Sequence, residues 1–529
     1  MSRVLRAGRA PTRRRFLTTI ASAAAGTALG GLAAPAFSRL AERPVITHGV
    51  QSGDVSAESG IVWARADRPA RMLIETATTE SFKDIRNAAY VDALPESDFT
   101  AKALIEDLPA GQDIFYRLRF QDLSSPNVIG EPVVGRFRTA PRDTRPVSFV
   151  WSGDTAGQGW GIDSSRGGMR TYATMLNNRP DFFVHCGDNI YADCAIPAKL
   201  KLPNGGTWRN IVTEEKSKAA ETLAEYRGNY KYNLLDQNLR AFNAEVPMFA
   251  QWDNHEVMEE WWPGEPLNRR GYVEKNAMLL AARGCRAFHE FMPLRYTPAE
   301  PGRIYRKISY GPLLDVFLLD MRSYRGPNDG RPADHYGPDV YLLGPAQLAW
   351  LKRELARSKA TWKVIASDTP LGTIVAGAPG ARRPLGRGIE IADLLSFMQQ
   401  ASIRNTLWIT ADLHYTAAHY FDPNQAVFQD FEPFWEFVSG PIHAGTWTPS
   451  KLDTTFGLHV VYQSAASREQ GENLAPCFGL QFFGRVAIDG TTGVLTATLK
   501  DIHDRALWSK QIEPKSDRNA RSTRPSLPG

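Results

Sequence analysis

From Val147 onward, short apolar runs alternate with longer stretches of helical periodicity. The runs "VSFVWSGD", "DFFVHCGD", "VPMFAQWDNHE" and "TLWITADLH" are separated by stretches such as "RTYATMLNNRP" and "GPAQLAWLKRELARS". Nearly continuous apolar strands bounded by helices are typical of a largely parallel sheet that is buried on both faces. The alternation therefore predicts an α/β fold for this part of the chain.

The preceding segment, residues 43–141, has a different pattern. Runs such as "SGIVWARA", "ARMLIETA" and "DIFYRLRFQDL" are short, rich in β-branched and aromatic residues, and separated by Gly, Pro and Ser. This pattern predicts a small β-sandwich. We expect a β-sandwich domain at 43–141, a larger α/β domain at 147–514 that ends in β hairpins, and a polar tail at 515–529.

The first 36 residues differ from the rest of the chain, because they contain six Arg and no acidic residue. "TRRRFLTT" (Thr12–Thr19) is followed by an Ala- and Gly-rich apolar segment and by "APA" (Ala34–Ala36), which together predict a twin-Arg export signal at 1–36. The alternative is a transmembrane anchor, but the Gly and Thr content and the short apolar run make this a poor membrane span. We expect export by the twin-Arg machinery to the periplasm or the extracellular space, without a stable membrane anchor.

The net charge depends on the same leader. The whole chain has a formal charge of +5, and without the six leader arginines the charge becomes −1. A nearly neutral protein has no broad electrostatic attraction for nucleic acid, so we expect no nucleic-acid binding.

The four cysteines, Cys186, Cys194, Cys285 and Cys477, do not have the spacing of a zinc ribbon. In an oxidising compartment, Cys186 and Cys194 could form a disulfide. The equally good alternative is that the cysteines are buried as small hydrophobic residues.

Each strand of the α/β part ends in a polar cluster, and the carboxyl ends of strands are where open α/β sheets bind ligands. The clusters are "SGDTAG" with Asp154, "CGDNIY" with Asp188 and Tyr191, "WDNHE" with Asn254 and His255, and "TADLH" with Asp412 and His414. A single Asp at such a position more often caps the next helix, and a single His is more often a hydrogen-bonded core residue. Four clusters in succession instead favour a two-metal hydrolytic site.

The order of these motifs resembles the calcineurin-like metallophosphoesterase superfamily, and within it the alkaline phosphatase D (PhoD-like) family. The resemblance extends to "THGVQSGDVSAESGIVWARA", "LLDMRSYRG" and "EFVSGPI", and it covers nearly the whole chain after the leader. It implies a four-layer αββα sandwich, of the α/β (α+β) class, preceded by a small fibronectin- or immunoglobulin-like β-sandwich.

The resemblance also implies two metal ions, with Asp188 as the carboxylate that bridges them. The other implied ligands are Asp154, Tyr191 and His414 for one metal, and Asn254 and Asp412 for the other. His255 would act as the proton donor to the leaving group.

The expected metals are Fe³⁺ and Ca²⁺. Well-known PhoD enzymes carry a Cys in the first motif, whereas this chain has Asp154 in "WSGDTAG". Tyr191 suits Fe³⁺, because phenolate is a hard ligand, and Asp412 moves the second site toward metals that prefer oxygen. Mn²⁺ and Zn²⁺ remain alternatives.

We therefore expect an exported phosphatase or phosphodiesterase in which hydroxide held by the metals attacks phosphorus. One alternative is specialisation for diesters of the teichoic-acid or phospholipid type. A non-catalytic, metal-stabilised binding module is the other, but the free imidazole expected of His255 argues against it.

Several nearby polar residues have two interpretations. Arg322 and Arg325 could bind a phosphate oxygen or form structural ion pairs. Asp253 could be a ligand or an acceptor that orients His255. Asp368 is a candidate for a further ligand, whereas Asp193 and His185 are predicted to be structural.

Overall fold

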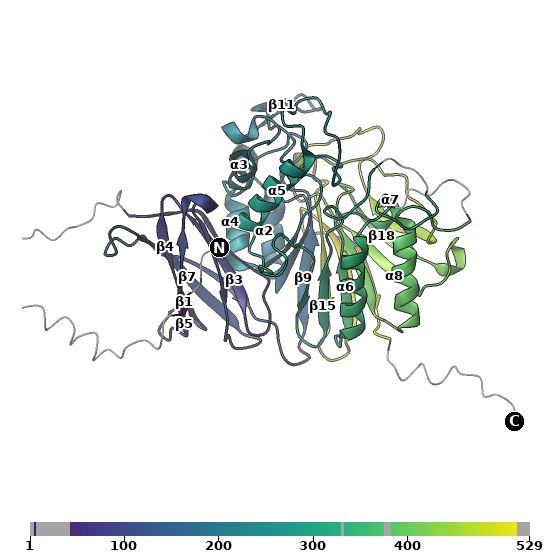
Figure 1. Ribbon diagram of the computed structural model, residues 1–529, viewed down its shortest axis with the longest axis horizontal. Helices are drawn as coiled ribbons and strands as arrows, with labels where there is room; N and C mark the ends of the chain where they lie inside the picture. Colours follow the sequence, from purple (N-terminus) through teal and green to yellow (C-terminus); the bar gives the residue numbers. More distant parts are fainter. Residues whose placement is uncertain (1–4, 7–42, 329–332, 375–381, 516–529) are drawn as a thin grey trace, which may run out of the picture.

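The computed structural model describes residues 5–6, 43–328, 333–374 and 382–515 (Figure 1). The predicted export signal at 1–36, apart from residues 5–6, and the predicted tail after residue 515 lie outside the described residues. Within the described ranges, none of the helices has the length and apolar character that are needed to span a bilayer.

The strands and the α-helices are given separately, each in chain order. The strands are β1 (Leu5–Arg6), β2 (Ile46–Gly53), β3 (Gly60–Ala66), β4 (Ala70–Ala77), β5 (Asn87–Ala93), β6 (Thr100–Ile105), β7 (Asp113–Asp122), β8 (Val133–Arg138), β9 (Val147–Ser152), β10 (Phe182–Cys186), β11 (Lys199–Lys201), β12 (Thr207–Arg209), β13 (Met248–Gln251), β14 (Arg306–Ser309), β15 (Leu314–Leu318), β16 (Trp362–Ala366), β17 (Thr406–Thr410), β18 (Thr416–Phe421), β19 (Phe434–Val438), β20 (Leu458–Ser464), β21 (Phe482–Ile488), β22 (Leu495–Asp501) and β23 (Ala506–Ile512). The α-helices are α2 (Arg170–Asn177), α3 (Leu223–Asn233), α4 (Gln237–Glu245), α5 (Ala277–Phe291), α6 (Gly344–Arg357), α7 (Leu371–Ile374) and α8 (Gly388–Gln400).

Two large sheets form the centre of the molecule. One has the strand order β23-β22-β21-β9-β10-β13-β2-β3-β6, and the other has the order β14-β15-β16-β17-β19-β18-β20. Strands β9, β10 and β13 are parallel, and so are β15, β16, β17 and β19. The carboxyl ends of these parallel strands carry the predicted site residues.

The alternation of side chains along the strands explains the layers. Phe149 and Trp151 of β9 join the core between the two sheets, whereas Val150 joins the core beneath α2, α3, α4 and α5. In the second sheet, Val364 points into the inter-sheet core and Ile365 packs against α6 and α8. The arrangement is therefore helix–sheet–sheet–helix, and Figure 1 shows the two helical layers on opposite flanks. This confirms the predicted fold class.

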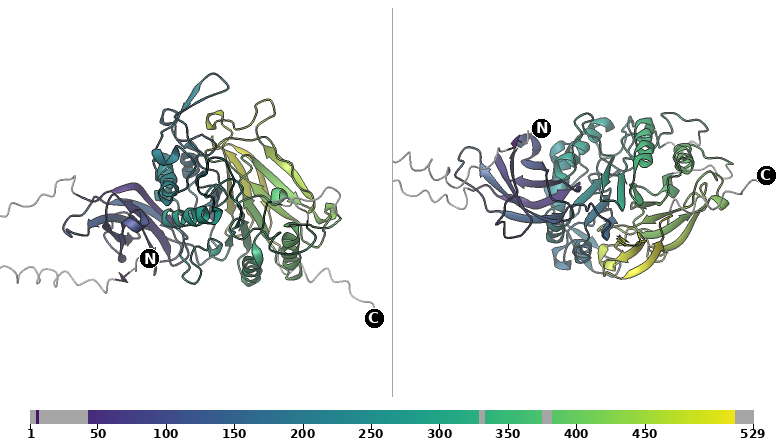
Figure 2. Two further views of the ribbon diagram at one scale, coloured as in Figure 1. Left: turned by 45° about the horizontal axis from the view of Figure 1, so that its top comes forward. Right: turned by 90° about the horizontal axis from the view of Figure 1, so that it is seen from below.

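The segment 43–141 supplies four strands of a five-stranded sheet, β1-β5-β4-β7-β8, at one end of the molecule (Figure 2), and residues 5–6 supply the edge strand β1. The remaining strands of the segment 43–141, β2, β3 and β6, continue the nine-stranded sheet, because β2 pairs with β13 in parallel at Gly53 and Met248. Strands from both sides of the predicted boundary thus share one sheet. The division into two domains at 141–147 stays a prediction.

Two local features differ from the simplest interpretation of the sequence. The long helical stretch before "VPMFAQWDNHE" is two helices. The first, α3, ends at Asn233, and Asp236 caps the N-terminus of α4 by accepting a hydrogen bond from the Leu239 N–H at 3.0 Å. The polar insertion after Ala195 is not an irregular loop throughout, since it contains the β11–β12 hairpin at the top of Figure 1.

Candidate metal centre

Loops from both large sheets bring three of the predicted ligands, Asp154, Asp188 and His414, together. Asp154 follows β9 and Asp188 follows the neighbouring strand β10, whereas Asp412 and His414 follow β17 of the other sheet. The first two loops continue to pair beyond their strands, because the N–H of Thr155 donates to the carbonyl of Asp188 at 2.9 Å. The site therefore lies where the carboxyl ends of β9 and β10 in one sheet meet the carboxyl end of β17 in the other.

The close approach of these loops requires unusual backbone conformations. A Cβ on Gly153 would lie 2.7 Å from the Cβ of Ala411, so only glycine allows the loops after β9 and β17 to touch. The left-handed region is occupied by Asp154 (φ 67°), Asp188 (φ 52°), Asp412 (φ 65°) and His414 (φ 56°). Non-glycine residues in this region are strained and cluster at functional sites, which supports a functional role for these loops.

Asp154, Asp188 and His414 form a buried group whose candidate ligand atoms all lie within 4.8 Å of one another. The hydroxyl of Tyr191 lies 2.8 Å from Nε2 of His414. Nδ1 of His414 lies 2.6 Å from the carbonyl oxygen of Gly445, so Nδ1 carries the proton and the Nε2 lone pair faces the group. A second hydrogen bond of this kind typically orients a metal-binding histidine.

The electrostatics of this group favour a bound positive charge. Burial, reinforced by the negative charge of Asp253, raises the pKa values of Asp154, Asp188 and Asp412 well above the usual range of a carboxyl group. Oδ2 of Asp154 is buried without a hydrogen-bond partner among the described residues, and a Cβ on Gly440 would occupy the space next to it. Carboxylates, a phenol and an imidazole so arranged fit a metal ion, which would replace the missing partner.

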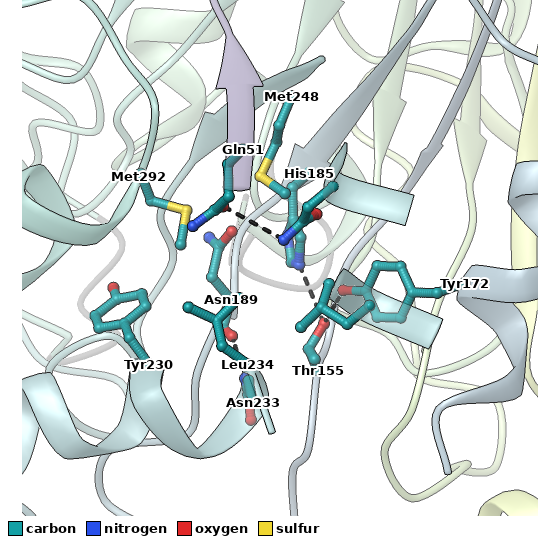
Figure 3. Close-up of a pocket in the computed structure, with 12 residues that line it drawn as sticks. Gln51, Thr155, Tyr172, His185, Asn189, Tyr230, Asn233, Leu234, Met248 and Met292 are labelled. Atoms are coloured by element: carbon teal, nitrogen blue, oxygen red, sulfur yellow. Dashed lines mark hydrogen bonds between the residues drawn. The ribbon is translucent and has the colours of Figure 1, made fainter. Parts of the chain in front are cut away.

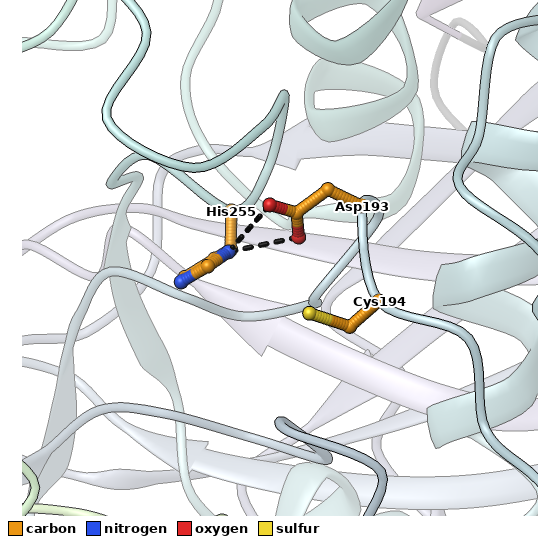
Figure 4. A group of neighbouring side chains, drawn as sticks. All are labelled: Asp193, Cys194 and His255. Atoms are coloured by element: carbon orange, nitrogen blue, oxygen red, sulfur yellow. Dashed lines mark hydrogen bonds and ion pairs between the residues drawn. The ribbon is translucent and has the colours of Figure 1, made fainter. Parts of the chain in front are cut away.

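His255 borders this group without belonging to it. Its N–H donates to Oδ1 of Asp188 at 3.1 Å, and its ring stacks on Tyr191 with centroids 4.2 Å apart. Nδ1 lies 2.8 Å and 3.0 Å from the two carboxylate oxygens of Asp193 (Figure 4). Burial would lower the pKa of His255, but the Asp193 carboxylate outweighs burial and raises that pKa to about 9.

Asp193, which was predicted to be structural, contacts the ring of His255. The sequence signal for this contact was weak, because the two residues lie 62 positions apart. Asp193, Cys194 and His255 form a second group whose candidate ligand atoms lie within 4.8 Å of one another, and Figure 4 shows the Cys194 thiol beside Asp193. Cys186, which is buried in the core, and Cys194 are both free cysteines, so no disulfide joins them in the structure.

Asn254 and Asp253 occupy the loop between β13 and His255. In the orientation that satisfies its hydrogen bonds, the Asn254 amide nitrogen lies 3.3 Å from Oδ1 of Asp253 and its oxygen lies 3.2 Å from the N–H of Glu260. Asp253 faces Arg322 rather than His255, because its Oδ1 accepts a hydrogen bond from Nε of Arg322. Of the two carboxylates Asp193 and Asp253, Asp193 is therefore the one that contacts the His255 ring.

Sequence reasoning also missed Glu256, a completely buried carboxylate that fastens two of the loops together. It accepts hydrogen bonds from the N–H groups of Asp188 at 3.2 Å, Asn189 at 2.5 Å and Asp253 at 2.8 Å. The side chain of Asn189 donates to the same carboxylate at 2.8 Å. Glu256 thus fixes the loop after β10 relative to the loop after β13.

Sequence comparisons agree with this geometry. A sequence model of the PhoD-like phosphatase family matches residues 149–499, and a model of the N-terminal domain of PhoD-like phosphatases matches residues 31–141. The chain belongs to the PhoD-like phosphatase family. The predicted PhoD-like family is thereby confirmed, and it is a family of phosphoric ester hydrolases.

Individual relatives show how far the likeness extends. Alkaline phosphatase D of Bacillus subtilis (strain 168) is 26% identical over 407 residues, which span 72% of this chain and 66% of that protein, just under two thirds of its length. A solved structure of PhoD aligns with a TM-score of 0.68 at 20% identity, over 91% of this chain and 94% of the other. The purple acid phosphatase PPD1 from yellow lupin aligns with a TM-score of 0.55 at 14% identity, over 89% and 74% of the two chains. At these identities, the two structures show a shared fold.

A buried cavity lies behind the ligand loops of this PhoD-like chain (Figure 3). Thr155 and Asn189, which line it, directly follow two candidate ligands, but none of the candidate ligands lines the cavity itself. His185 Nδ1, Asn189 Oδ1, Tyr230 OH and Asn243 Oδ1 line it without hydrogen-bond partners among the described side chains. These four polar atoms in an otherwise largely apolar cavity suit ordered water.

Proposed function

We propose that this chain hydrolyses phosphate esters at the metal centre formed by Asp154, Asp188 and His414. The observation that carries the proposal is the buried group of these three residues and Tyr191, with the ring of His255 beside it. Burial raises the pKa values of Asp154 and Asp188, and Oδ2 of Asp154 lacks a partner among the described residues. Both observations support bound cations at this place.

Within the centre, Asp188 would bridge two metals. Asp154, Tyr191 and His414 would hold one metal, and Asn254 and Asp412 would hold the other. Metal ions bound here would neutralise phosphoryl oxygens and supply a water of lowered pKa as the nucleophile. The donors fit Fe³⁺ and Ca²⁺, because the tyrosine oxygen is hard and the second set consists of oxygen atoms; Mn²⁺ and Zn²⁺ are the alternatives.

The chain itself supplies the proton for the leaving group. Asp193 accepts the Nδ1 proton of His255, so Nε2, which lies 3.6 Å from the largely exposed carboxylate of Glu259, would face a substrate once that side chain moves aside. In this role His255 protonates the departing alkoxide, and Tyr191 supports its ring by stacking. The Asp188 carboxylate fixes the His255 backbone through the 3.1 Å hydrogen bond.

Export is part of the same proposal. The twin-Arg pattern in residues 1–36 supports transport of the folded protein out of the cytoplasm, because a protein that folds around its metals can load them before it is exported. The proposed location is the periplasm or the extracellular space.

Hydrolysis of p-nitrophenyl phosphate and bis-p-nitrophenyl phosphate, with and without a chelator, tests the proposal. We expect metal-dependent release of nitrophenolate from one or both esters. A strong preference for the second compound would indicate specialisation for diesters. The absence of activity toward both in metal-loaded protein would contradict hydrolysis and favour the non-catalytic binding module.

A further inference from the structure

The loop after β15 carries two buried arginines with very different surroundings. Arg322 is 1% exposed and its hydrogen-bonding groups are occupied. Its Nε donates to Asp253, Nη2 donates to Thr369 at 3.0 Å, and Nη1 lies 3.3 Å from Oε2 of Glu260. Nε also lies 3.8 Å from Oδ2 of Asp368. Arg322 is therefore a structural cation that holds the acidic loops together.

Arg325 has no such set of partners. It is 8% exposed, and its buried Nε has no hydrogen-bond partner among the described residues. Its ion pair is with Glu260, whose Oε2 lies 3.8 Å from Nη1, beyond hydrogen-bond distance. Burial and the charges of Arg322 and Arg387 lower the pKa of Arg325 to about 9. The buried Nε is costly without an acceptor, so an additional oxygen ligand beside Arg325 would be favourable.

The position of Arg325 connects it to the metal centre. Glu260 accepts a hydrogen bond from Arg322, and Arg322 also donates to Asp253, which precedes the candidate ligand Asn254. The positive charge of Arg325 also acts on the buried Asp368. The Glu260 side chain is 50% exposed, so it can leave Arg325 without disturbing the core.

We propose that Arg325, when the Glu260 carboxylate moves away, binds non-bridging oxygens of the substrate's phosphoryl group in its place, and so selects dianionic monoesters over monoanionic diesters. This inference rests on the proposed function. A guanidinium presents two N–H groups in a planar fork that matches two phosphoryl oxygens. A monoester carries about one negative charge more than a diester above pH 7. A cation at this position would therefore bind the monoester more strongly than the diester.

The test compares Arg325→Gln and Arg325→Lys with the metal-loaded wild type. For R325Q we expect kcat/KM for p-nitrophenyl phosphate to fall about 10- to 100-fold, the range for losing a charged hydrogen bond. The value for bis-p-nitrophenyl phosphate should change less than about threefold. R325K keeps the charge but not the fork, so it should lie between R325Q and the wild type. R357Q, which removes a 68% exposed arginine at the end of α6, is the matched control for charge.

A second readout keeps the inference separate from the proposed function. Calorimetric binding of inorganic phosphate to the metal-loaded protein should weaken about tenfold or more in R325Q or R325K, with an unchanged Tm. If the wild type hydrolyses neither ester, the proposed function fails, and phosphate binding alone decides the role of Arg325. Equal losses for both esters, or unchanged phosphate affinity, would overturn the proposal. If R325Q does not fold, the two esters and phosphate binding are compared between R325K and the wild type.

Discussion

At the scale of single residues, the contact between Asp193 and His255 determines what the imidazole can do. The carboxylate lies on Nδ1 at 2.8 Å and 3.0 Å, and the ring stacks on Tyr191. These contacts leave Nε2 as the atom that can give up a proton. In this account His255 binds no metal, so its loss should separate catalysis from metal binding.

We predict that His255→Ala keeps its metals but loses about 10²–10⁴ in kcat, the usual contribution of a general acid. Asp193→Asn should lose less, and both losses should be larger for phenyl phosphate than for p-nitrophenyl phosphate, because a poor leaving group depends more on protonation. Steady-state kinetics with the two esters and metal analysis check this. His335→Ala, which removes an exposed histidine, is the control. A loss of equal size for both esters would argue against proton donation.

His289, near the end of α5, gives a prediction about pH. Burial and the ammonium of Lys102 lower the pKa of His289 from 6.5 to about 4. Between these values the unfolded chain takes up a proton that the folded chain does not, so the free energy of unfolding falls as the pH is lowered from about 6.5 to 4. We expect His289→Gln to remove up to about 3 kcal/mol of this dependence. Thermal unfolding at pH 5 and 7.5 measures it, with the exposed His503→Gln as control; identical slopes in wild type and variant would be inconsistent with the prediction.

At the scale of elements, the loops after β10 and β13 act as one unit because Glu256 binds the backbone of both. We predict that Glu256→Ala lowers the free energy of unfolding by about 2–4 kcal/mol, since it leaves three buried N–H groups without an acceptor. It should also weaken metal retention. Urea unfolding in the presence and absence of chelator checks both effects, and Glu259→Ala, next to the same loop but largely exposed, is the matched control. A variant as stable as the control would show that the loops do not depend on this carboxylate.

The sequence could predict those elements whose burial follows from their own pattern of apolar and polar residues. The apolar runs of β9, β10 and β17 predicted buried strands, and the polar residues after them predicted a shared site, because parallel strands end at the same edge. The structure brings Asp154, Asp188 and His414 together, while their roles stay predictions. The partners of Arg322 and of His255 could not be predicted, because they come from distant segments whose spacing in space depends on the whole fold.

At the scale of the whole molecule, the N-terminal and C-terminal parts are linked through the sheet and through an ion pair. Asp54, which follows β2 and is completely buried, binds Nη2 of Arg306 at 2.6 Å and Nε at 2.8 Å. Arg306 begins β14 of the seven-stranded sheet. The pairing of β2 with β13 was not predictable, because nothing in a strand's sequence specifies a partner so far away along the chain.

We predict that Asp54→Asn lowers the free energy of unfolding by about 3–5 kcal/mol, because it leaves a largely buried arginine without its counter-charge. Asp92→Asn, which removes one partner of a more exposed ion pair with Arg71, should cost about 0–1 kcal/mol. Calorimetry should show one cooperative transition for residues 43–515 in the wild type. Two separate transitions, with only the first shifted by D54N, would mean that the shared sheet does not couple the two parts.

The central claim is that buried donors from both sheets bind metal ions that this phosphatase needs. Metal analysis of the purified wild type and of Asp188→Asn, with p-nitrophenyl phosphate hydrolysis measured on the same samples, tests it most directly. The account predicts two metal ions per wild-type chain, and loss of both metal and activity in a D188N protein that remains folded. A wild type that hydrolyses the ester at full rate while holding no metal would contradict it.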